Sequence, residues 1–238
     1  MPLKAFQFKQ FSVAHDKCAM KVGTDAVLLG AWATINHCPK SVLDVGAGSG
    51  ILALMLAQRS TAELIDAIEI DVEAYEQCVQ NFEQSPWSDR LFCYHASLEE
   101  FTQEIEDKYD LIVSNPPFYT NQFETKNNAR DLARFEKAMP FDQLVSSVKM
   151  LLSDNGQFCV IIPFSEEGVF CSLAKQQQLY CIKKLRVCGQ KHGGIKRSLM
   201  VFSRKEQDIE TQEMYLEDGR HNYSESYREM AKEFYLKF

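Results

Sequence analysis

Short apolar runs alternate with longer amphipathic segments through most of the chain. The runs are rich in β-branched and aromatic residues, whereas the segments between them repeat their apolar positions at helical spacing. This alternation is typical of βαβ units, in which parallel strands are joined by right-handed crossovers. The predicted strands are residues 42–45, 64–71, 91–95, 109–114 and 157–162, and the predicted helices are 51–58, 72–84, 98–105, 141–152 and 164–178, with a turn at 153–156.

The two ends of the chain depart from this alternation. Residues 179–188 and 195–204 read as two strands joined by a glycine-containing loop, which predicts an antiparallel hairpin that closes the sheet. Apolar positions alternate loosely over residues 6–13, as in a hairpin arm, and helices are expected over 26–33 and 224–236. The pattern predicts one α/β domain, with a mostly parallel seven-stranded sheet and a C-terminal antiparallel hairpin.

A glycine-rich turn joins the first predicted strand to its helix. Asp44, Gly46, Gly48 and Gly50 follow the spacing D-x-G-x-G-x-G. Glycines are needed where backbone N–H groups and a helix N-terminus approach a ligand without a Cβ in the way. The spacing differs from the G-x-G-x-x-G fingerprint that makes room for a pyrophosphate. An adenosine-containing cofactor that need not carry a phosphate fits this turn, and a purely structural turn is the alternative.

Acidic residues close the second predicted strand. Glu69 and Asp71 lie where nucleotide-binding folds place the carboxylate that accepts hydrogen bonds from ribose hydroxyls. We assign Glu69 to the ribose and Asp71 to the N-cap of the next helix, because an acid before a helix commonly accepts its free N–H groups. Ser97 follows the third strand, falls at the same edge of the sheet, and is expected to cap the helix after it.

A proline-rich turn follows the fourth strand, with the sequence Asn115-Pro116-Pro117-Phe118. Two prolines fix φ at about −65° and remove two backbone donors, so this turn is rigid and rich in carbonyl groups. The Asn115 amide oxygen and the Pro116 carbonyl can face an –NH₂ group as paired acceptors. Phe118 offers a face on which a planar base or amide can stack. Taken alone, a proline pair after a strand is only a loop terminator.

These motifs, in this order, resemble one enzyme family. The glycine turn, Glu69 and the N-P-P-F turn are similar to those of Rossmann-like S-adenosylmethionine-dependent methyltransferases of the N-P-P-[YF] branch, and the likeness covers residues 40–205. That branch methylates amino groups conjugated to a planar system. The stretch KVGTDAVLL at 21–29 and the ending EFYL at 233–236 look more narrowly like the bacterial tRNA(Val) adenosine-37 N6-methyltransferase family.

The resemblance implies S-adenosylmethionine as cofactor and tRNA as partner. By that resemblance Asp44, Gly46, Gly48 and Gly50 hold the methionine part, Glu69 the ribose, Ser97 the adenine edge, and Asn115, Pro116 and Phe118 the target base. Many relatives have Asp where this chain has Ser97. The adenine contact is therefore also open to the backbone of Ala96 or Leu98.

We divide the single predicted domain into three parts. Residues 1–36 form a hairpin and helix over the cofactor site, 37–205 the core, and 206–238 a C-terminal strand and helix. Thr24 and Asp25 stand where the N-terminal helix starts, and either side chain can cap it. The alternative places both residues over the amino-acid end of the cofactor, because a helix N-terminus favours a carboxylate.

Local charge changes the picture more than net charge does. The net charge of −7 argues against wholesale affinity for nucleic acid. Residues 183–205 nevertheless contain eight basic residues and no acid, and such a stripe suits phosphates. Interleaved charges near the proline turn also read as a solvated helix face. The candidate RNA contacts are Lys191, Lys196 and Arg197 at the predicted loop tip, and Lys126 and Arg130 after the proline turn.

Composition argues against several other classes of protein. The eight cysteines contain no C-x-x-C pair and the five histidines have no ligand spacing, so we expect reduced core thiols and no metal. No apolar run approaches the roughly 20 residues of a membrane span, and no signal-peptide core is present. We expect a cytoplasmic protein with no membrane partner. The residues do not define the oligomeric state, and a monomer is the working expectation.

The predicted function is transfer of a methyl group from S-adenosylmethionine to the exocyclic N6 amine of an adenosine in tRNA, by the resemblance adenosine 37 of tRNA(Val). The sulfonium is already activated, so positioning suffices and no Ser/His/Asp or paired-carboxylate site is needed. Two alternatives stay open. One is a protein glutamine N5-methyltransferase, since a carboxamide also offers a planar –NH₂, although the basic hairpin argues against it. The other is a non-catalytic cofactor- or RNA-binding module.

Overall fold

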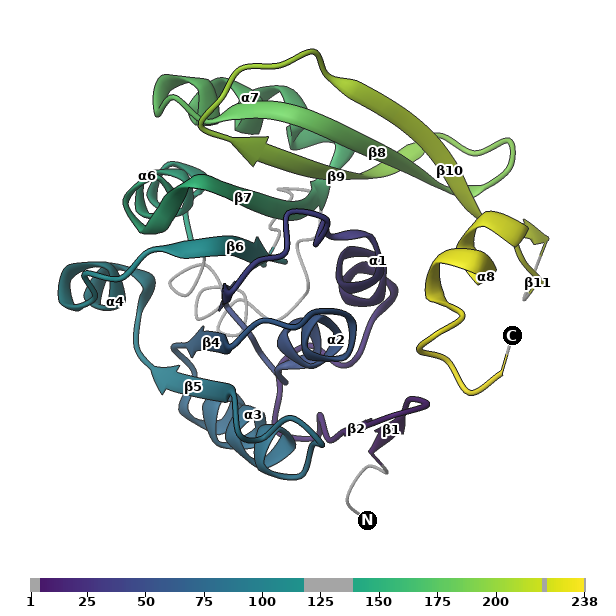
Figure 1. Cartoon of the computed structure of the whole chain (residues 1–238). Helices are drawn as coiled ribbons and strands as arrows, with labels where there is room; N and C mark the ends of the chain where they lie inside the picture. The colour runs from purple at the N-terminus through teal and green to yellow at the C-terminus, as the bar shows by residue number, and fades with distance from the viewer. Residues whose placement is uncertain (1–4, 118–138, 220–221, 238) are drawn as a thin grey trace, which may run out of the picture.

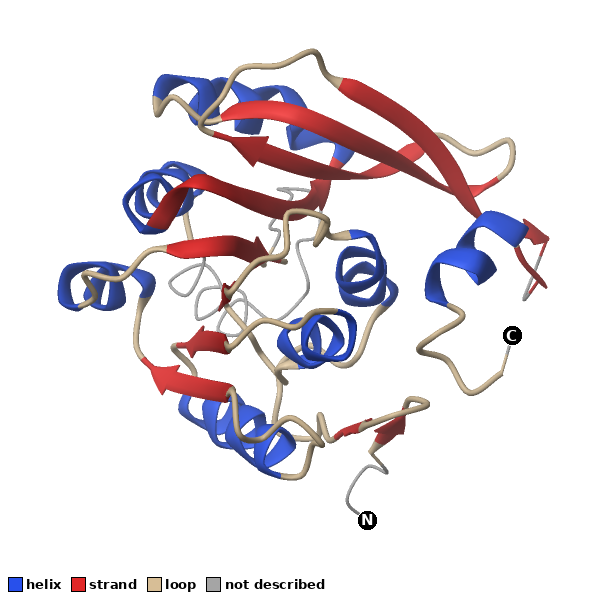
Figure 2. Cartoon of the chain, viewed as in Figure 1, coloured by secondary structure: helices blue, strands red, loops and turns tan. Residues whose placement is uncertain are grey.

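The computed structural model describes residues 5–117, 139–219 and 222–237, and the main sheet within these ranges has nine strands (Figures 1 and 2). Its parallel part has the order β5-β4-β3-β6-β7. Strand order reverses at β3, and open α/β sheets bind ligands outside the carboxyl ends of the strands at such a point. The bounds are β3 Ser41–Val45, β4 Leu64–Glu69, β5 Leu91–His95, β6 Tyr109–Ser114 and β7 Leu152–Pro163.

Helices cover both faces of this parallel part (Figure 2). Neighbouring residues of β3 therefore enter different cores: Val42 packs in one hydrophobic cluster and Leu43 in the other. Burial on both faces explains why these strands read as continuous apolar runs. The first cluster is covered by α1 (Thr24–Trp32), α2 (Ile51–Arg59) and α3 (Val72–Glu83) and also contains residues of the C-terminal helix at 225–231. The second is covered by α4 (Leu98–Glu104), α6 (Phe141–Leu151) and α7 (Glu167–Gln176).

The C-terminal strands widen the sheet beyond the predicted hairpin. β8 (Tyr180–Gln190) and β9 (Ile195–Ser203) form that antiparallel hairpin, and β9 pairs antiparallel with β7. β10 (Glu210–Gly219) then adds parallel to β8, and β11 (Asn222–Tyr223) adds antiparallel to β10. The fold class is as predicted, and β10 and β11 account for the two strands beyond seven.

Two local predictions are wrong in detail. The turn predicted at residues 153–156 lies inside β7 as a bulge, because Leu152 pairs with Tyr109 whereas Gln157 pairs with Leu111. Gly156 permits this close packing, since a Cβ there would lie 2.9 Å from the Tyr109 carbonyl oxygen. The last helix, α8 (Glu225–Ala231), starts after its predicted cap but ends before residue 236.

The N-terminal hairpin packs against the other end of the chain. β1 (Phe6–Gln7) and β2 (Ser12–Val13) pair antiparallel, as predicted. The Lys9 amide donates to the Phe234 carbonyl at 2.8 Å, and Phe8 pairs with Tyr235 in an isolated bridge. Segments at the two chain ends are thereby joined beside α1 and α2.

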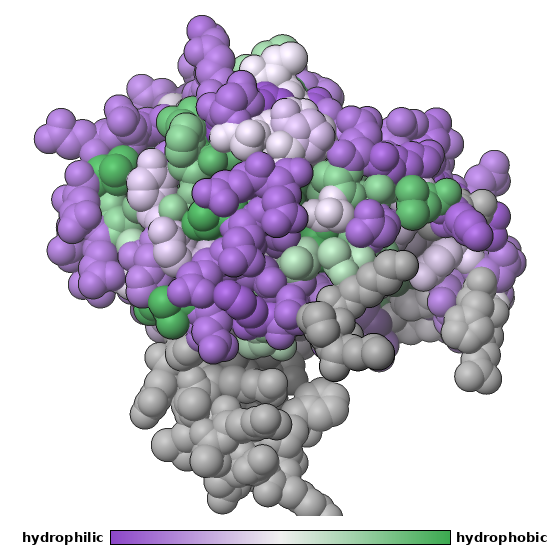
Figure 3. Space-filling view, turned by 90° about the horizontal axis from the view of Figure 1, so that it is seen from below, coloured by the Kyte–Doolittle hydropathy of each residue, from purple (hydrophilic) through white to green (hydrophobic). Residues whose placement is uncertain are grey.

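Polar residues dominate the visible surface. Figure 3 shows a largely hydrophilic face on which hydrophobic side chains are scattered between polar ones. The large exposed hydrophobic residues come from separate elements, for example Met20, Phe92, Met150 and Leu236. Among the described residues, no helix combines the length and apolar character that a membrane crossing requires.

Candidate active site

The glycine turn is built at the carboxyl end of β3. Gly46, Gly48 and Gly50 all have positive φ, at 73°, 56° and 77°. A Cβ on Gly50 would lie 2.5 Å from the Phe82 ring and 2.7 Å from the Cys78 sulfur, so packing demands glycine there. A Cβ on Gly46 or Gly48 would meet nothing within 4 Å. The outer side of the turn is therefore an open cradle of backbone.

Glu69 closes one side of this cradle. Its Oε2 accepts a hydrogen bond from the Gly48 amide at 2.8 Å, and its Oε1 accepts from the Asp71 amide at 2.9 Å. Asp71 caps α3, since its Oδ1 accepts from the amides of Glu73 and Ala74 at 3.1 and 3.2 Å. The predicted division of labour between the two acids is confirmed as far as the cap is concerned. The ribose role of Glu69 stays a prediction, and its position beside the cradle is compatible with it.

Asp44 lies beneath the turn and is fully buried. Its Oδ2 accepts from the Ala53 amide at 3.2 Å, while its Oδ1 has no hydrogen-bond partner among the described residues. Burial raises the pKa of Asp44 to about 7, although the hydrogen bond from Ala53 acts in the opposite direction. This unsatisfied oxygen is a buried acceptor next to the cradle.

Ser97 is engaged in capping α4. Its Oγ donates to the Glu100 carboxylate at 2.7 Å and accepts from the Glu100 amide at 3.2 Å, and the same carboxylate accepts from the Ser97 amide. This reciprocal arrangement is a capping box. The expected cap is confirmed, and because the side chain has its partners within the helix, the predicted contact to the adenine gains no support from the geometry.

Residues 14–23, here called the strap, lie against the glycine turn. They belong to the N-terminal part that is expected over the cofactor site, but the contacts that hold them are not predicted from the sequence. The Asn81 side chain, on α3, accepts from the Ala14 amide at 2.9 Å and donates to the Ala14 carbonyl at 2.8 Å. The same Nδ2 donates to the Ser49 carbonyl at 2.8 Å. Asn81 is buried and thus connects the strap directly to the glycine turn.

One helical turn earlier, Gln77 holds the middle of the strap. Its Oε1 accepts from the Lys17 amide at 2.8 Å. Burial, followed by the nearby carboxylates of Glu69 and Asp71, raises the pKa of the Cys18 thiol to about 12. The strap therefore leads from the glycine turn, past Gln77 and the Glu69 carboxylate, to the start of α1. Two buried amides at i and i+4 on one helix face were the available sequence signal.

Thr24 and Asp25 do not cap α1, so that prediction is wrong. The N-cap position is Gly23, and no side chain accepts a hydrogen bond from the first turn. Thr24 is already the first helical residue, and the Asp25 carboxylate accepts instead from Arg197 Nε at 2.8 Å. The guanidinium of β9 draws this carboxylate away from the helix end.

The proline turn leaves the sheet from β6, the neighbour of β3. Asn115 Oδ1 is buried and has no hydrogen-bond partner among the described residues. Pro116 is buried, and Ser114 Oγ donates to the Val45 carbonyl at 2.9 Å, which fixes the end of β6 to β3. A buried acceptor without a partner among the described residues can receive a donor from a ligand at this edge. Phe118 lies outside the described residues.

Four of the eight basic residues in the stripe form ion pairs within the chain. The ion pairs are Lys183 with Glu210 at 3.7 Å, Lys184 with Glu167 at 2.9 Å, Arg186 with Glu167 at 2.8 Å, and Arg197 with Asp25 at 2.8 Å. The prediction that Arg197 faces solvent at a loop tip is wrong, because it is a partly buried residue of β9. Lys191 is exposed in the β8–β9 turn, and Lys196 is exposed near the start of β9. Lys126 and Arg130 lie outside the described residues.

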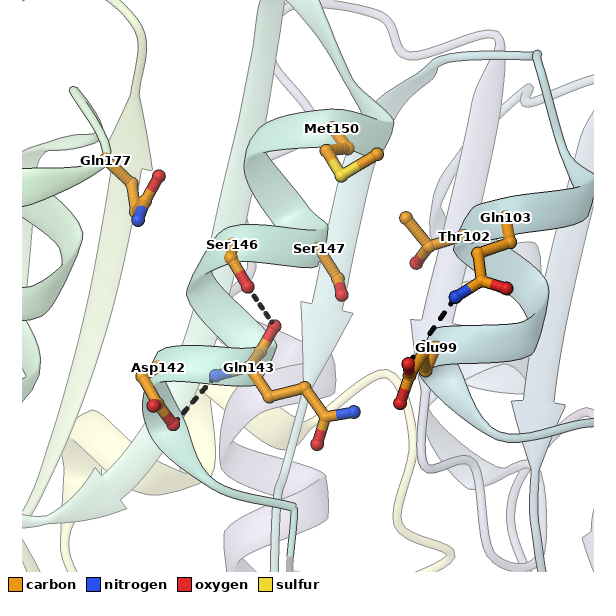
Figure 4. Close-up of a pocket in the computed structure, with 9 residues that line it drawn as sticks. All are labelled: Glu99, Thr102, Gln103, Asp142, Gln143, Ser146, Ser147, Met150 and Gln177. Carbon is orange, nitrogen blue, oxygen red and sulfur yellow. Dashed lines mark hydrogen bonds between the residues drawn. The ribbon is translucent and has the colours of Figure 1, made fainter.

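An open groove of about 710 Å³ lies elsewhere, between α4 and α6 (Figure 4). Its walls carry Ser146 and Met150 from α6 and Glu99 and Gln103 from α4, with no residue of the glycine turn. The cradle and Asn115 thus form a site distinct from this groove. Within the described ranges, no three His, Cys, Asp or Glu residues are grouped to hold a metal ion.

Comparisons with known proteins agree with this geometry. A family model described as the methyltransferase small domain matches residues 20–163. A tRNA1(Val) (adenine(37)-N6)-methyltransferase of Flavobacterium johnsoniae is 60% identical over 233 residues, covering 98% of this chain and 99% of that protein. A protein of the same name from Yersinia enterocolitica is 39% identical, covering 98% of this chain and 93% of its own length.

Solved structures show the same fold at low identity. A crystal structure described as a predicted O-methyltransferase from Agrobacterium tumefaciens has a TM-score of 0.67 at 16% identity, covering 88% of this chain and 96% of the other. TYW2 of Pyrococcus horikoshii, crystallised with MeSAdo, has a TM-score of 0.58 at 14% identity, covering 86% and 72%. The predicted Rossmann-like methyltransferase fold is confirmed.

Proposed function

This chain belongs to the family of tRNA1(Val) (adenine(37)-N6)-methyltransferases, and we propose that it methylates the exocyclic N6 amine of adenosine 37 in tRNA(Val). Within the structure, one observation carries this proposal. Asn115 presents a buried amide oxygen without a partner among the described residues, at the end of the strand next to the glycine turn. An exocyclic amine has two hydrogens and needs such an acceptor.

We propose S-adenosylmethionine as the methyl donor, and the cradle fits it. At Gly46 and Gly48 the absence of a Cβ leaves room against the backbone. The turn and the N-terminus of α2 would hold the methionine part, and Glu69, whose oxygens can accept further hydrogen bonds, the ribose. Bound there, the cofactor supplies a methyl group activated by its sulfonium. The other proposed cofactor contacts are Asp44, Ser97, Thr24 and Asp25.

In the proposed mechanism, Asn115 and Pro116 position the nucleophile. The Asn115 Oδ1 and the Pro116 carbonyl accept the two N6 hydrogens, which directs the nitrogen lone pair and stabilises the positive charge that develops on it. Pro116 and Pro117 have no backbone N–H, so no donor from them competes for Asn115. Phe118 is the proposed stacking surface for a base taken out of its stack. The extra proton leaves after transfer, so no strong base is required.

For tRNA binding, Lys191 and Lys196 are the strongest phosphate candidates. Both are exposed, and Arg197 beside them pairs with Pro163, the last residue of β7, which places this turn at the carboxyl edge of the sheet. Arg197 remains a proposed contact whose guanidinium is shared with Asp25. Lys126 and Arg130 remain proposed contacts as well. We propose that the enzyme acts in the cytoplasm, as a tRNA substrate implies, and that it acts as a monomer.

Transfer of labelled methyl into RNA and into protein tests this function. Purified protein is given labelled S-adenosylmethionine with total RNA or total protein, and cofactor binding is measured in parallel. The proposal expects label in RNA, recovered as N6-methyladenosine. Label in protein glutamine would establish the alternative substrate, and cofactor binding without transfer to either pool would indicate a non-catalytic module.

A further inference from the structure

Phe164 is an aromatic residue at the functional edge of the sheet that core packing does not explain. It directly follows β7 and opens the short 3-10 turn η1 (Phe164–Glu166) that leads into α7. It is partly exposed, and it belongs to neither of the two hydrophobic clusters that fill the faces of the sheet. Its ring lies instead against the guanidinium of Arg186.

Arg186 lies over this ring and is fixed there by an ion pair. Its guanidinium carbon lies 5.3 Å from the Phe164 ring centroid. The guanidinium binds the Glu167 carboxylate through two hydrogen bonds, Nη2 to Oε1 at 2.8 Å and Nε to Oε2 at 3.2 Å. A bidentate pair of this kind fixes the plane of the guanidinium as well as its position.

Glu167 is a buried anchor for Arg186. It is 6% exposed and also accepts from Lys184 Nζ at 2.9 Å and from Ser198 Oγ. Burial alone favours the protonated form, but the hydrogen bonds from Arg186, Ser198 and Lys184 outweigh it and lower the pKa of Glu167 to about 2. The carboxylate therefore stays charged at neutral pH, and Arg186 stays in place.

The sheet register places Phe164 near the proposed reaction site. β6 and β7 are adjacent and parallel, with Ser114 opposite Val160. Asn115 lies one residue beyond that row and Phe164 four residues beyond it, so the two are offset by about 10 Å along the strands at about 3.3 Å per residue. The exposed Lys196 belongs to β9, whose Arg197 pairs with Pro163. Aromatic, cationic and amide groups thus share one edge.

We propose that Phe164, backed by Arg186, is a platform on which an unpaired base of the RNA substrate stacks, next to the adenosine that receives the methyl group. This inference rests on the proposed function. Bases of single-stranded RNA are recognised by stacking on aromatic rings and guanidinium planes. The offset from Asn115 suits a nucleotide that flanks the target, whereas Phe118 is the surface proposed for the target adenine itself. The other explanation is that the ring only packs against Arg186.

Substitutions at Phe164 separate these explanations. Phe164→Leu keeps an apolar side chain without a ring, and we expect RNA affinity to fall about 10- to 100-fold while cofactor affinity and thermal stability stay near the parental values. Phe164→Trp should restore RNA affinity. Phe92→Leu, at an aromatic residue 44% exposed on the edge strand β5, four strands away from β7, is the matched control and should bind like the parent. Parental RNA affinity in Phe164→Leu would overturn the platform.

Substrate RNAs with one abasic nucleotide identify the stacked base. An RNA that lacks the flanking base should bind the parent and Phe164→Leu equally, because the stacking partner is already gone, whereas an RNA abasic at the target should preserve their difference. A difference that persists in every abasic RNA would overturn base stacking, and one that vanishes only with the target base would overturn the flanking assignment. A parental protein that binds no RNA and transfers no methyl would refute the proposed function itself.

Discussion

Arg197 donates from Nε to Oδ2 of Asp25 at 2.8 Å, which ties the start of β9 to the first turn of α1. The two residues are far apart in sequence and have different proposed partners, Asp25 the cofactor and Arg197 the RNA. Their side chains are 28% and 34% exposed, so solvent screens the pair. The ion pair joins the start of α1, where the strap ends, to the basic edge of the sheet.

This pair should contribute modestly to stability. Asp25→Ala and Arg197→Ala, alone and combined, form a double-mutant cycle in which we expect a coupling free energy of about 0.2–1 kcal/mol, the range of partly exposed ion pairs. Denaturant unfolding measures it. Strict additivity of the two substitutions would show that the ion pair does not stabilise the fold.

Gly48 and Gly50 should respond differently to the same substitution. Gly48→Ala places a Cβ in the open cradle, where the cofactor is proposed to bind. The left-handed φ at this position costs about 1–2 kcal/mol of folding free energy for a residue with a Cβ. We expect the loss of cofactor affinity to exceed this loss of stability. Gly50→Ala adds a clash with Phe82 and Cys78 and should lower the free energy of unfolding further. Calorimetric titration with S-adenosylmethionine and denaturant unfolding separate the two effects. Parental cofactor affinity in a folded Gly48→Ala would remove the cradle as the binding site.

Asn81 should control the strap. Asn81→Ala leaves the backbone groups of Ala14 and the Ser49 carbonyl without this partner, and we expect a loss of about 1–3 kcal/mol in unfolding free energy together with weaker cofactor binding. Trypsin cleavage after Lys17 and Lys21 should become faster. Gln80→Ala, an exposed residue of the same helix, is the control. If strap cleavage and cofactor affinity both match the control, Asn81 does not position the strap.

Because four residues of the basic stripe are in ion pairs, Lys191 and Lys196 should contribute most of the salt-dependent RNA affinity of this stripe. Replacing both with Ala should reduce the slope of log affinity against log salt by up to about two units, one for each phosphate that the lysines neutralise. Lys175→Ala, an exposed lysine on α7, is the control. Fluorescence anisotropy across a salt series measures the slope. A slope equal to that of the control would make these lysines ordinary surface charges.

Local sequence signals predicted the elements that build the site. The strand, glycine turn and helix around Gly48, and the strand before Asn115, each depend on neighbours in the sequence, and the structure reproduces both. The cap at Asp71 is equally local, since a carboxylate reaches the first N–H groups of its own helix. Such features follow from chain geometry within a few residues.

Long-range contacts account for what the sequence did not reveal. The number of basic residues at 183–205 predicted that Lys184 and Arg186 belong to a phosphate-binding stripe. In the fold, both residues form ion pairs with the buried Glu167. In the sequence Thr24 and Asp25 resemble helix caps, but in the fold the Asp25 carboxylate accepts a hydrogen bond from Arg197 of β9. The polar residues at 153–156 resemble a turn, yet β7 absorbs them as a bulge against β6. Each outcome depends on a partner that is distant in sequence.

The central claim is that Asn115 positions the substrate amine, and single-turnover methyl transfer by Asn115→Ala tests it most directly. Folding and cofactor affinity should stay near the parental values, because Asn115 Oδ1 has no partner to lose among the described residues. The rate constant for transfer to tRNA(Val) should fall roughly a hundredfold or more, the scale of losing one preorganised polar group, and the parental product should be N6-methyladenosine by mass analysis. A parental rate in Asn115→Ala, or methyl found on another atom, would contradict the account.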